Sequence, residues 1–308
     1  MKRFIFSITI VLIPILFLEV GFRIFTKELT SAEDSFQLRV CEEILGEYDD
    51  DLFWRLKGVK PDFKTVSGKE SLKIICLSDS VSIMNGDKDY PNILQVLLSK
   101  ALPKENPIVF NGGVPGYTSF QGLKYFTNEL LSYYPDVVIV CYGWNDHWQS
   151  SNKLSDKLQK SPKNKFIKNI IGSSRMLSHI NALALKIKQR RYKRVGPEQF
   201  VRVSLEDYKY NLSEFIDICK NKNILIILMT APYLDREGEW IPLHKEYNSI
   251  VRQVALKENV KIIDLVETFV DREDLFIEPK VDYVHYNWRG SQIVAQALAD
   301  VISDLKLN

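Results

Sequence analysis

Short apolar runs alternate with longer amphipathic segments from residue 72 to the end of the chain. Each run is rich in β-branched residues and stays apolar at successive positions, which is typical of strands buried on both faces of a parallel sheet. The segments between them carry apolar residues at the spacing of a helix. The predicted strands are residues 72–77, 108–111, 137–142, 224–229 and 260–265, and the predicted helices are residues 90–102, 119–132, 205–221, 243–258 and 289–305. The alternation predicts a doubly wound, three-layer α/β/α domain around a five-stranded parallel sheet, as in flavodoxin-like folds.

A strongly apolar segment precedes this domain. Residues 4–25 are long enough to cross a bilayer, which takes about 20 residues, and their only charged residues are Glu19 and Arg23. These two lie on one helix face, where they can pair and lower each other's cost of burial. No small-residue cleavage site follows the apolar run, so we expect an N-terminal transmembrane helix within residues 1–26. A cleaved signal peptide and a buried core helix are the alternatives.

The apolar segment also predicts where the rest of the chain lies. Basic residues at positions 2 and 3 favour a cytoplasmic N-terminus, which puts the remainder on the periplasmic or cell-surface side of the membrane. If the segment were cleaved, the protein would be secreted. Residues 27–70 show no strong periodicity and are predicted to be a leader segment, followed by the α/β domain over residues 71–308.

The domain is interrupted by a strongly basic insertion at residues 151–196. It contains thirteen Lys or Arg residues and a single acid, Asp156, which gives a formal charge of +12. Such a segment is usually a solvated, partly helical insertion, and the alternative is a basic face that contacts anionic lipid or acidic glycan. The whole chain has 41 basic and 39 acidic residues and no nucleic-acid recognition motif, so no nucleic acid is expected as a partner.

Polar residues capable of catalysis follow four of the predicted strands. The carboxyl ends of parallel strands meet at one edge of a sheet, where α/β enzymes gather their ligands. The four stretches are residues 78–80 (SDS), 111–116 (NGGVPG), 143–146 (GWND) and 282–285 (DYVH). Each stretch alone is commonly a turn or a helix cap. Their joint occurrence, each after a different strand, favours a site.

Together these stretches supply the groups that acyl transfer requires. Ser80 is a hydroxyl at a strand end and needs a base to accept its proton, which His285 can be. Asp282 lies three residues before the histidine and can hold its Nδ1–H. The N–H groups of Ser80 and Gly116 and the side-chain amide of Asn145 can donate to an oxyanion.

The motifs S-D-S, N-x-G-x-x-G, G-x-N-D and D-x-x-H resemble the four sequence blocks of the SGNH (GDSL) hydrolases, over roughly residues 71–305. The resemblance implies the fold of that family. It also implies Ser80 as the nucleophile, Asp282 and His285 as the orienting acid and the base, and Gly116 and Asn145 as oxyanion-hole donors.

Two further segments resemble membrane-anchored, bacterial-type members of that family. One is the apolar N-terminus that ends in E-x-x-x-R, and the other is the leader stretch at residues 47–58. One position departs from the family pattern, because Ser78 stands where the first block usually has glycine. A positive φ at that position would strain the turn by about 1 kcal/mol, whereas a negative φ would make the substitution harmless.

Residues beside the motifs are expected to line the substrate pocket. They are Asp79, Tyr117, Trp144, His147 and Trp148. The alternative for His147 is an exposed surface position, and His244, at the start of a predicted helix, is expected to be solvated. No histidines or acids share metal-ligand spacing beyond D-x-x-H, so neither a metal nor another cofactor is expected.

These expectations converge on a serine esterase that hydrolyses O-acyl or O-acetyl esters of an envelope glycan or lipid through an acyl-Ser80 intermediate. An acyltransferase that uses the same intermediate is one alternative. The other is a catalytically impaired module in which Ser78 deforms the turn and the cleft only binds glycan or lipid.

Overall fold

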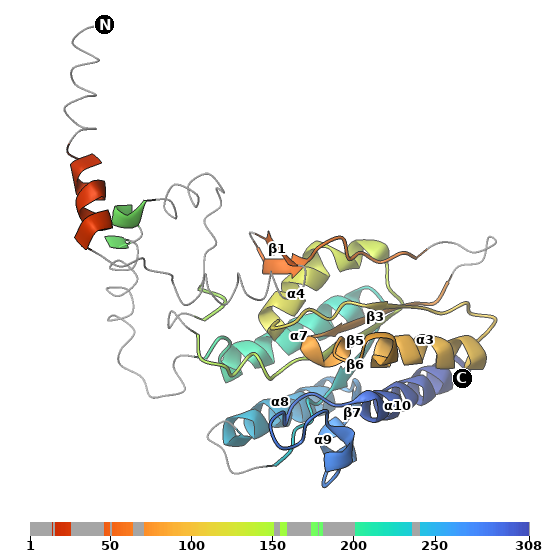
Figure 1. Ribbon diagram of the computed structural model, residues 1–308. Helices are drawn as coiled ribbons and strands as arrows, with labels where there is room; N and C mark the ends of the chain where they lie inside the picture. Colours follow the sequence, from red (N-terminus) through yellow and green to blue (C-terminus); the bar gives the residue numbers. More distant parts are fainter. Residues whose placement is uncertain are drawn as a thin grey trace, which may run out of the picture.

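A five-stranded sheet forms the centre of the protein (Figure 1). The strands are β3 (Lys73–Ser78), β4 (Ile108–Asn111), β5 (Val137–Cys141), β6 (Leu225–Met229) and β7 (Lys261–Ile263). All are parallel, in the order β4-β3-β5-β6-β7, so the chain winds from β3 to β4 on one side and then to β5, β6 and β7 on the other. The predicted five-stranded parallel sheet is confirmed. This computed structural model describes residues 14, 16–25, 46–49, 51–63, 71–150, 155–158, 174–177, 179–180, 201–235 and 241–307.

Helices cover both faces of the sheet and complete the predicted three layers. One face carries α3 (Tyr90–Ala101) and α10 (Trp288–Leu307), and the other carries α4 (Ser119–Asn128), α7 (Leu205–Asn221) and α8 (Ile241–Glu258). The side chains of β3 alternate between them. Ile74 and Cys76 pack with the first layer, and Ile75 and Leu77 pack with the second. A strand buried on both sides must be apolar at every position, which explains the continuous apolar runs of the sequence.

Short elements connect these layers. They are α9 (Leu265–Thr268) and the 3-10 turns η1 (Ser80–Ser82), η2 (Gly86–Lys88), η3 (Leu130–Tyr133) and η5 (Glu273–Leu275). Helix α4 begins with a capping box, in which Thr118 and Gln121 each bond the other's backbone N–H. The helix ends at Asn128 rather than at the predicted residue 132, because η3 follows and Tyr134 closes it with a φ of 53°.

Part of the leader segment packs on the α4 side of the sheet. It forms an antiparallel hairpin of β1 (Gly46–Asp49) and β2 (Phe53–Leu56). The hairpin buries Leu52, Phe53 and Trp54 in the same core as α4 and α7. The leader therefore contributes to the hydrophobic core as well as preceding the domain.

The described part of the N-terminal segment is a helix over residues 16–25 with many exposed apolar side chains. Arg23 forms the expected ion pair with Glu19, at 2.8 Å. No helix among the described residues is long and apolar enough to cross a membrane. Residues 1–13, which hold much of the predicted transmembrane helix, lie outside the described residues.

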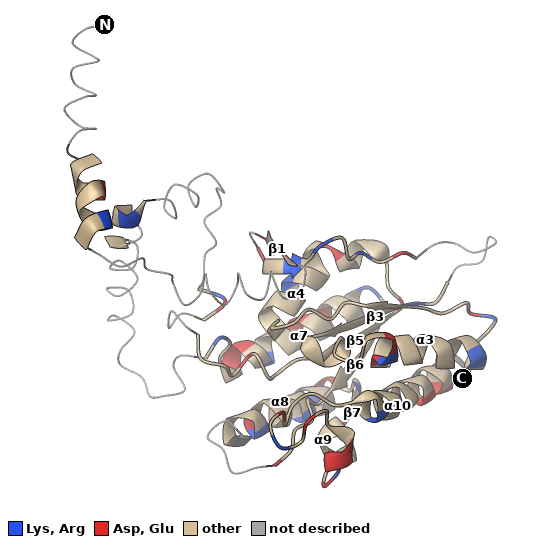
Figure 2. Cartoon of the chain, viewed as in Figure 1, with Lys and Arg blue, Asp and Glu red and all other residues tan. Residues whose placement is uncertain are grey.

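Most of the basic insertion also lies outside the described residues, but one short stretch of it meets the N-terminal helix. The Glu19 carboxylate accepts hydrogen bonds from the Ser174 hydroxyl and from the backbone N–H groups of Arg175 and Met176. Phe22 contacts the ring of His179 in the same place, with 5.3 Å between ring centroids. Figure 2 shows charged residues of both segments where they meet.

Candidate active site

Ser80 lies directly beyond the carboxyl end of β3, in the first position of η1. The turn is capped by Asp79, whose carboxylate accepts a hydrogen bond from the Val81 N–H at 3.1 Å. Ser80 is half-buried, and its Oγ lies 2.7 Å from Nε2 of His285. The sequence places these two residues 205 positions apart, and the fold brings them within hydrogen-bond distance.

The other ring nitrogen of His285 faces the carboxylate of Asp282. Nδ1 lies 2.8 Å from Oδ2, and the second oxygen of Asp282 accepts the N–H groups of Val284 and His285, both at 3.0 Å. Partial burial acts to raise the pKa of Asp282, but these backbone bonds and the imidazole outweigh it and hold the pKa below its usual value. The carboxylate therefore stays charged, and it orients the ring so that Nε2 faces Ser80.

Three groups near Ser80 can donate hydrogen bonds to an oxyanion. Among the residues that the structure describes, neither the N–H of Ser80 nor that of Gly116 has an acceptor. The Asn145 amide gives one N–H to Asp79 Oδ2 at 2.9 Å, which leaves its second N–H for a ligand. Gly116 has a φ of +75°, which suits glycine.

The serine at the first motif position, Ser78, does not strain the turn. It is the last residue of β3, and it is absent from the described non-glycine residues with positive φ. Its buried Oγ lies 2.6 Å from Ser82 Oγ, which lies 3.0 Å from Asn111 Oδ1. The backbone carbonyl of Ser78 accepts the Val114 N–H at 3.1 Å. Ser78 therefore joins the first motif to the glycine-rich loop.

The sequence model of the GDSL-like Lipase/Acylhydrolase family matches residues 76–293, which include all four motifs. The chain belongs to this family. As a GDSL-family member it is an enzyme, a serine hydrolase. No curated protein matched the chain.

Several solved structures share the fold of this GDSL-family enzyme at low sequence identity. Axe2, an acetylxylan esterase from Geobacillus stearothermophilus, is 19% identical with a TM-score of 0.50, over 74% of this chain and 93% of its own. The acetyl xylan esterase AlAXEase is 18% identical with a TM-score of 0.51, over 75% and 99%. LAE5, an α/β hydrolase from the metagenome of Lake Arreo in Spain, is 18% identical with a TM-score of 0.51, over 80% and 99%.

Two of the residues expected to line the pocket of the GDSL-family enzyme are packed in its core. His147 is fully buried, so it lies neither at a pocket mouth nor on the surface, and burial lowers its pKa to about 4. Its ring contacts Trp144, His244 and Tyr247. Tyr117 is also fully buried, and its hydroxyl donates to the backbone carbonyl of Trp54 in the leader at 2.6 Å.

His244, which was expected to be solvated, is likewise buried. It stacks on Trp144 with 3.9 Å between ring centroids. Burial, followed by the neighbouring His147, lowers its pKa to about 3. The expectation was wrong because aromatic residues of other segments enclose the ring, which one helix sequence does not reveal.

The other three expected lining residues differ in exposure. Asp79 and Trp144 are buried next to the site, whereas Trp148 is 52% exposed. Burial raises the pKa of Asp79, although the Val81 N–H, His285 and Asn145 all lower it. Asp79 therefore acts here as a buried acceptor for Asn145 rather than as an open pocket wall.

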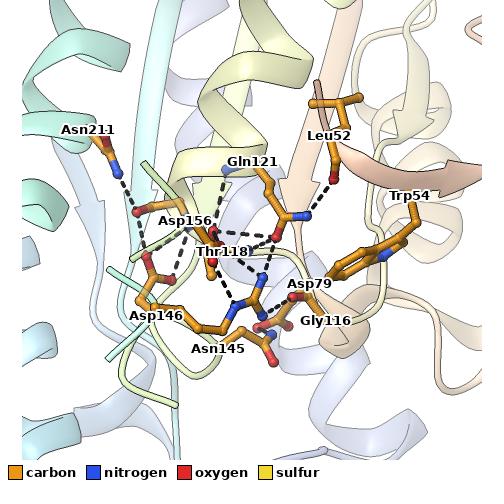
Figure 3. Close-up of polar contacts among 12 residues, drawn as sticks. Leu52, Trp54, Asp79, Gly116, Thr118, Gln121, Asn145, Asp146, Asp156 and Asn211 are labelled. Atoms are coloured by element: carbon orange, nitrogen blue, oxygen red, sulfur yellow. Dashed lines mark hydrogen bonds and ion pairs between the residues drawn. The ribbon is translucent and has the colours of Figure 1, made fainter. Parts of the chain in front are cut away.

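A buried polar network beside the site was not found from the sequence (Figure 3). Arg202 forms an ion pair with Asp156 at 2.9 Å and donates to the Gly116 carbonyl at 2.6 Å. Thr118 donates to the same carboxylate at 2.8 Å. The one available signal was Asp156 itself, the single acid within the basic insertion. A single acid within a strongly basic stretch is a candidate for a buried ion pair.

Proposed function

We propose that this enzyme is a serine esterase that removes O-acyl groups, acetyl groups foremost, from an envelope glycan or lipid. The observation that carries the proposal is the hydrogen-bonded chain from Ser80 through His285 to Asp282, with separations of 2.7 and 2.8 Å. A serine becomes a nucleophile when a base held by a third group can accept its proton. Two structures with the same fold are acetylxylan esterases, which favours an acetyl ester on a glycan.

This arrangement supports the following mechanism. Ser80 Oγ attacks the ester carbonyl carbon while His285 Nε2 takes the hydroxyl proton, and Asp282 stabilises the imidazolium. The negative charge that develops on the carbonyl oxygen is stabilised by the N–H groups of Ser80 and Gly116 and by the Asn145 amide. The C–O bond to the alcohol breaks as His285 returns the proton to it. Water then attacks the acyl-Ser80 carbonyl by the same steps and releases the carboxylic acid, with no cofactor or metal.

The nucleophile is tested with a fluorophosphonate probe on the wild-type protein and on Ser80→Ala. We expect the probe to label the wild type alone. Hydrolysis of acetyl through dodecanoyl esters should be fastest for the short chains. Equal labelling or equal turnover by folded Ser80→Ala would overturn the proposal. If an added sugar acceptor takes the acyl group in preference to water, the enzyme is an acyltransferase instead.

We also propose that residues 1–26 anchor the enzyme in a membrane, that residues 27–70 form a leader, and that the domain of residues 71–308 lies outside the cytoplasm. The exposed apolar side chains of residues 16–25 support the anchor. Alkaline extraction of membranes tests it, because a spanning helix stays with the lipid pellet. Recovery of the intact chain in the soluble fraction would contradict an uncleaved anchor.

The basic insertion at residues 151–196 is proposed to contact anionic lipid headgroups. Its stretch around Ser174 to Met176 is bonded to Glu19 at the end of the apolar helix, which favours a position near the membrane surface. Removing the charge of the insertion's lysines should reduce binding of residues 28–308 to vesicles that contain phosphatidylserine. Binding that is equal on purely zwitterionic vesicles would contradict this contact, and binding to an acidic polysaccharide alone would point to a glycan.

A further inference from the structure

Both peptide groups that flank Gly116 are held by side chains from distant parts of the chain. On one side, the indole Nε1–H of Trp54 donates to the Pro115 carbonyl at 3.0 Å. On the other side, Arg202 Nη1 donates to the Gly116 carbonyl at 2.6 Å. Gly116 also sits at a φ of +75°. The loop between β4 and α4 is therefore fixed on both sides of the glycine.

The bond to Pro115 determines where the Gly116 N–H points. In a trans peptide the C=O of one residue and the N–H of the next point in opposite directions, and the described residues contain no cis peptide bond. Because Trp54 holds the Pro115 oxygen on one side, the Gly116 N–H faces the other way. Among the described residues that N–H has no acceptor. Its direction is therefore fixed, and it is available to donate a hydrogen bond to a ligand.

Arg202 is itself rigidly placed. Its guanidinium bonds both oxygens of Asp156, at 2.9 and 3.3 Å, and Gln121 Oε1 at 2.6 Å. The same group lies over the Trp54 ring, with Cζ 5.6 Å from the ring centroid. Lys cannot take this position, because it lacks a planar guanidinium that bonds several acceptors at once and stacks on an indole. The side chain of Asp156 is 1% exposed and that of Arg202 is 11% exposed, so the ion pair is almost entirely buried.

The backbone around Trp54 is also fixed, by hydrogen bonds from the loop before α4 and from α4 itself. Its backbone carbonyl accepts the Tyr117 hydroxyl at 2.6 Å, and the Leu52 carbonyl accepts Gln121 Nε2 at 2.7 Å. Between them Phe53 has a φ of 70°, an unfavourable conformation for a bulky residue. Strain of this kind persists where the surrounding contacts over-determine the backbone. Trp54 lies outside residues 76–293, the part of the chain that the family model matches.

We propose that Trp54 and Arg202 are positioning residues of the oxyanion hole, which act on the substrate only through the Gly116 peptide. The leader hairpin would then be a functional part of the active site rather than a spacer. The same would hold for the base of the basic insertion, since Asp156 lies near its start and Arg202 lies shortly after its end at residue 196. This inference rests on the proposed function, in which Gly116 N–H donates to the oxyanion.

The test is Trp54→Phe, which removes the indole N–H and keeps an aromatic ring against Arg202. We expect kcat to fall by about 10-fold, because a misdirected donor loses part of the 10²–10³ that a whole donor contributes. We expect KM to change by less than about 2-fold, because the donor acts in the transition state. An alkylboronic acid, which forms a tetrahedral adduct on the nucleophile, should bind about 10-fold more weakly.

Two further variants separate positioning from stability. Arg202→Lys keeps the charge beside Asp156 and should lower kcat and boronate affinity in the same way as Trp54→Phe. Gln95→Met is the matched control, because Gln95 Nε2 donates to another proline carbonyl, that of Pro107, at 2.8 Å before β4 begins. It should change thermal stability without changing kcat.

The outcomes distinguish this inference from the proposed function. If Ser80→Ala abolishes turnover while folded Trp54→Phe keeps wild-type kcat and boronate affinity, the positioning role is wrong and the esterase proposal stands. If Ser80→Ala retains activity, the proposed function itself fails. If Gln95→Met lowers kcat as much as Trp54→Phe does, the fall reflects general destabilisation of the protein. That result would also overturn the inference.

Discussion

The Asp79 carboxylate accepts a hydrogen bond from the side-chain amide of Asn145 at 2.9 Å, and both residues are buried next to Ser80. The bond joins the first and third sequence motifs across the carboxyl ends of β3 and β5. Because Asp79 also accepts the Val81 N–H with its other oxygen, one carboxylate holds both the turn that carries Ser80 and the proposed oxyanion donor Asn145.

This double role predicts the effect of Asp79→Asn. An asparagine offers one oxygen to two donors, so either the Val81 N–H or the Asn145 amide would face an NH₂ group. We expect kcat to fall by about 10- to 100-fold, as for partial loss of an oxyanion donor, with little change in KM. Steady-state kinetics on a short-chain ester measure it. Wild-type kcat would mean that Asn145 does not depend on Asp79 for its orientation.

Asp282→Asn should be more damaging. The asparagine oxygen would still accept the N–H groups of Val284 and His285, and its NH₂ would then face His285 Nδ1. The imidazole would adopt the tautomer with its proton on Nε2, which cannot accept the proton of Ser80. We expect kcat to fall by about 10³- to 10⁴-fold.

The control for this variant is Asp274→Asn, which removes an exposed acid paired with Arg272 and should leave kcat unchanged. Near-normal turnover of Asp282→Asn would show that the charge and acceptor geometry of Asp282 are not required.

Ser78→Gly restores the usual residue of the family's first motif and tests whether the serine impairs the enzyme. Since Ser78 is extended and its hydroxyl bonds Ser82, we expect no gain in kcat and a loss of about 1 kcal/mol in the free energy of unfolding. Urea unfolding followed by circular dichroism measures the loss. A several-fold rise in kcat would instead indicate that the serine distorts the turn.

Much of the fold could be predicted because buried parallel strands and amphipathic helices leave continuous patterns in the sequence. The predicted strand of residues 137–142 became β5 (Val137–Cys141). Ser80 and His285 were predicted to meet because both follow strand ends that share one edge of the sheet. What could not be predicted depends on neighbours from other segments. The burial of His147 depends on Tyr247 and His244, and the network of Arg202 depends on a partner 46 positions away.

The buried acid Asp146 predicts a dependence of stability on pH. Burial raises its pKa to about 7, although hydrogen bonds from Ser119 lower it. The folded state then binds the proton more tightly than the unfolded chain does, so this contribution to stability is full below about pH 4 and is lost as the pH rises through about 7. In Asp146→Asn, the loss of stability between pH 4 and 7 that comes from Asp146 should disappear. Urea unfolding at pH 4.5 and 7.5 measures it, and an identical pH dependence in both proteins would contradict the prediction.

The buried histidine His147 predicts the opposite trend. Burial lowers its pKa to about 4, so the unfolded chain binds the proton more tightly than the folded state does. Its contribution to stability is full above about pH 6.5 and is lost as the pH falls towards 4. His147→Phe removes this titration, so the variant should gain about 2–3 kcal/mol relative to wild type between pH 7 and pH 4. Any packing cost of the larger ring against Trp144 and Tyr247 is the same at both pH values and cancels in this difference.

Because Asp146 and His147 titrate with opposite signs in one pH range, the two variants should move the stability profile in opposite directions. Parallel shifts would mean either that burial does not raise the pKa of Asp146 or that it does not lower the pKa of His147.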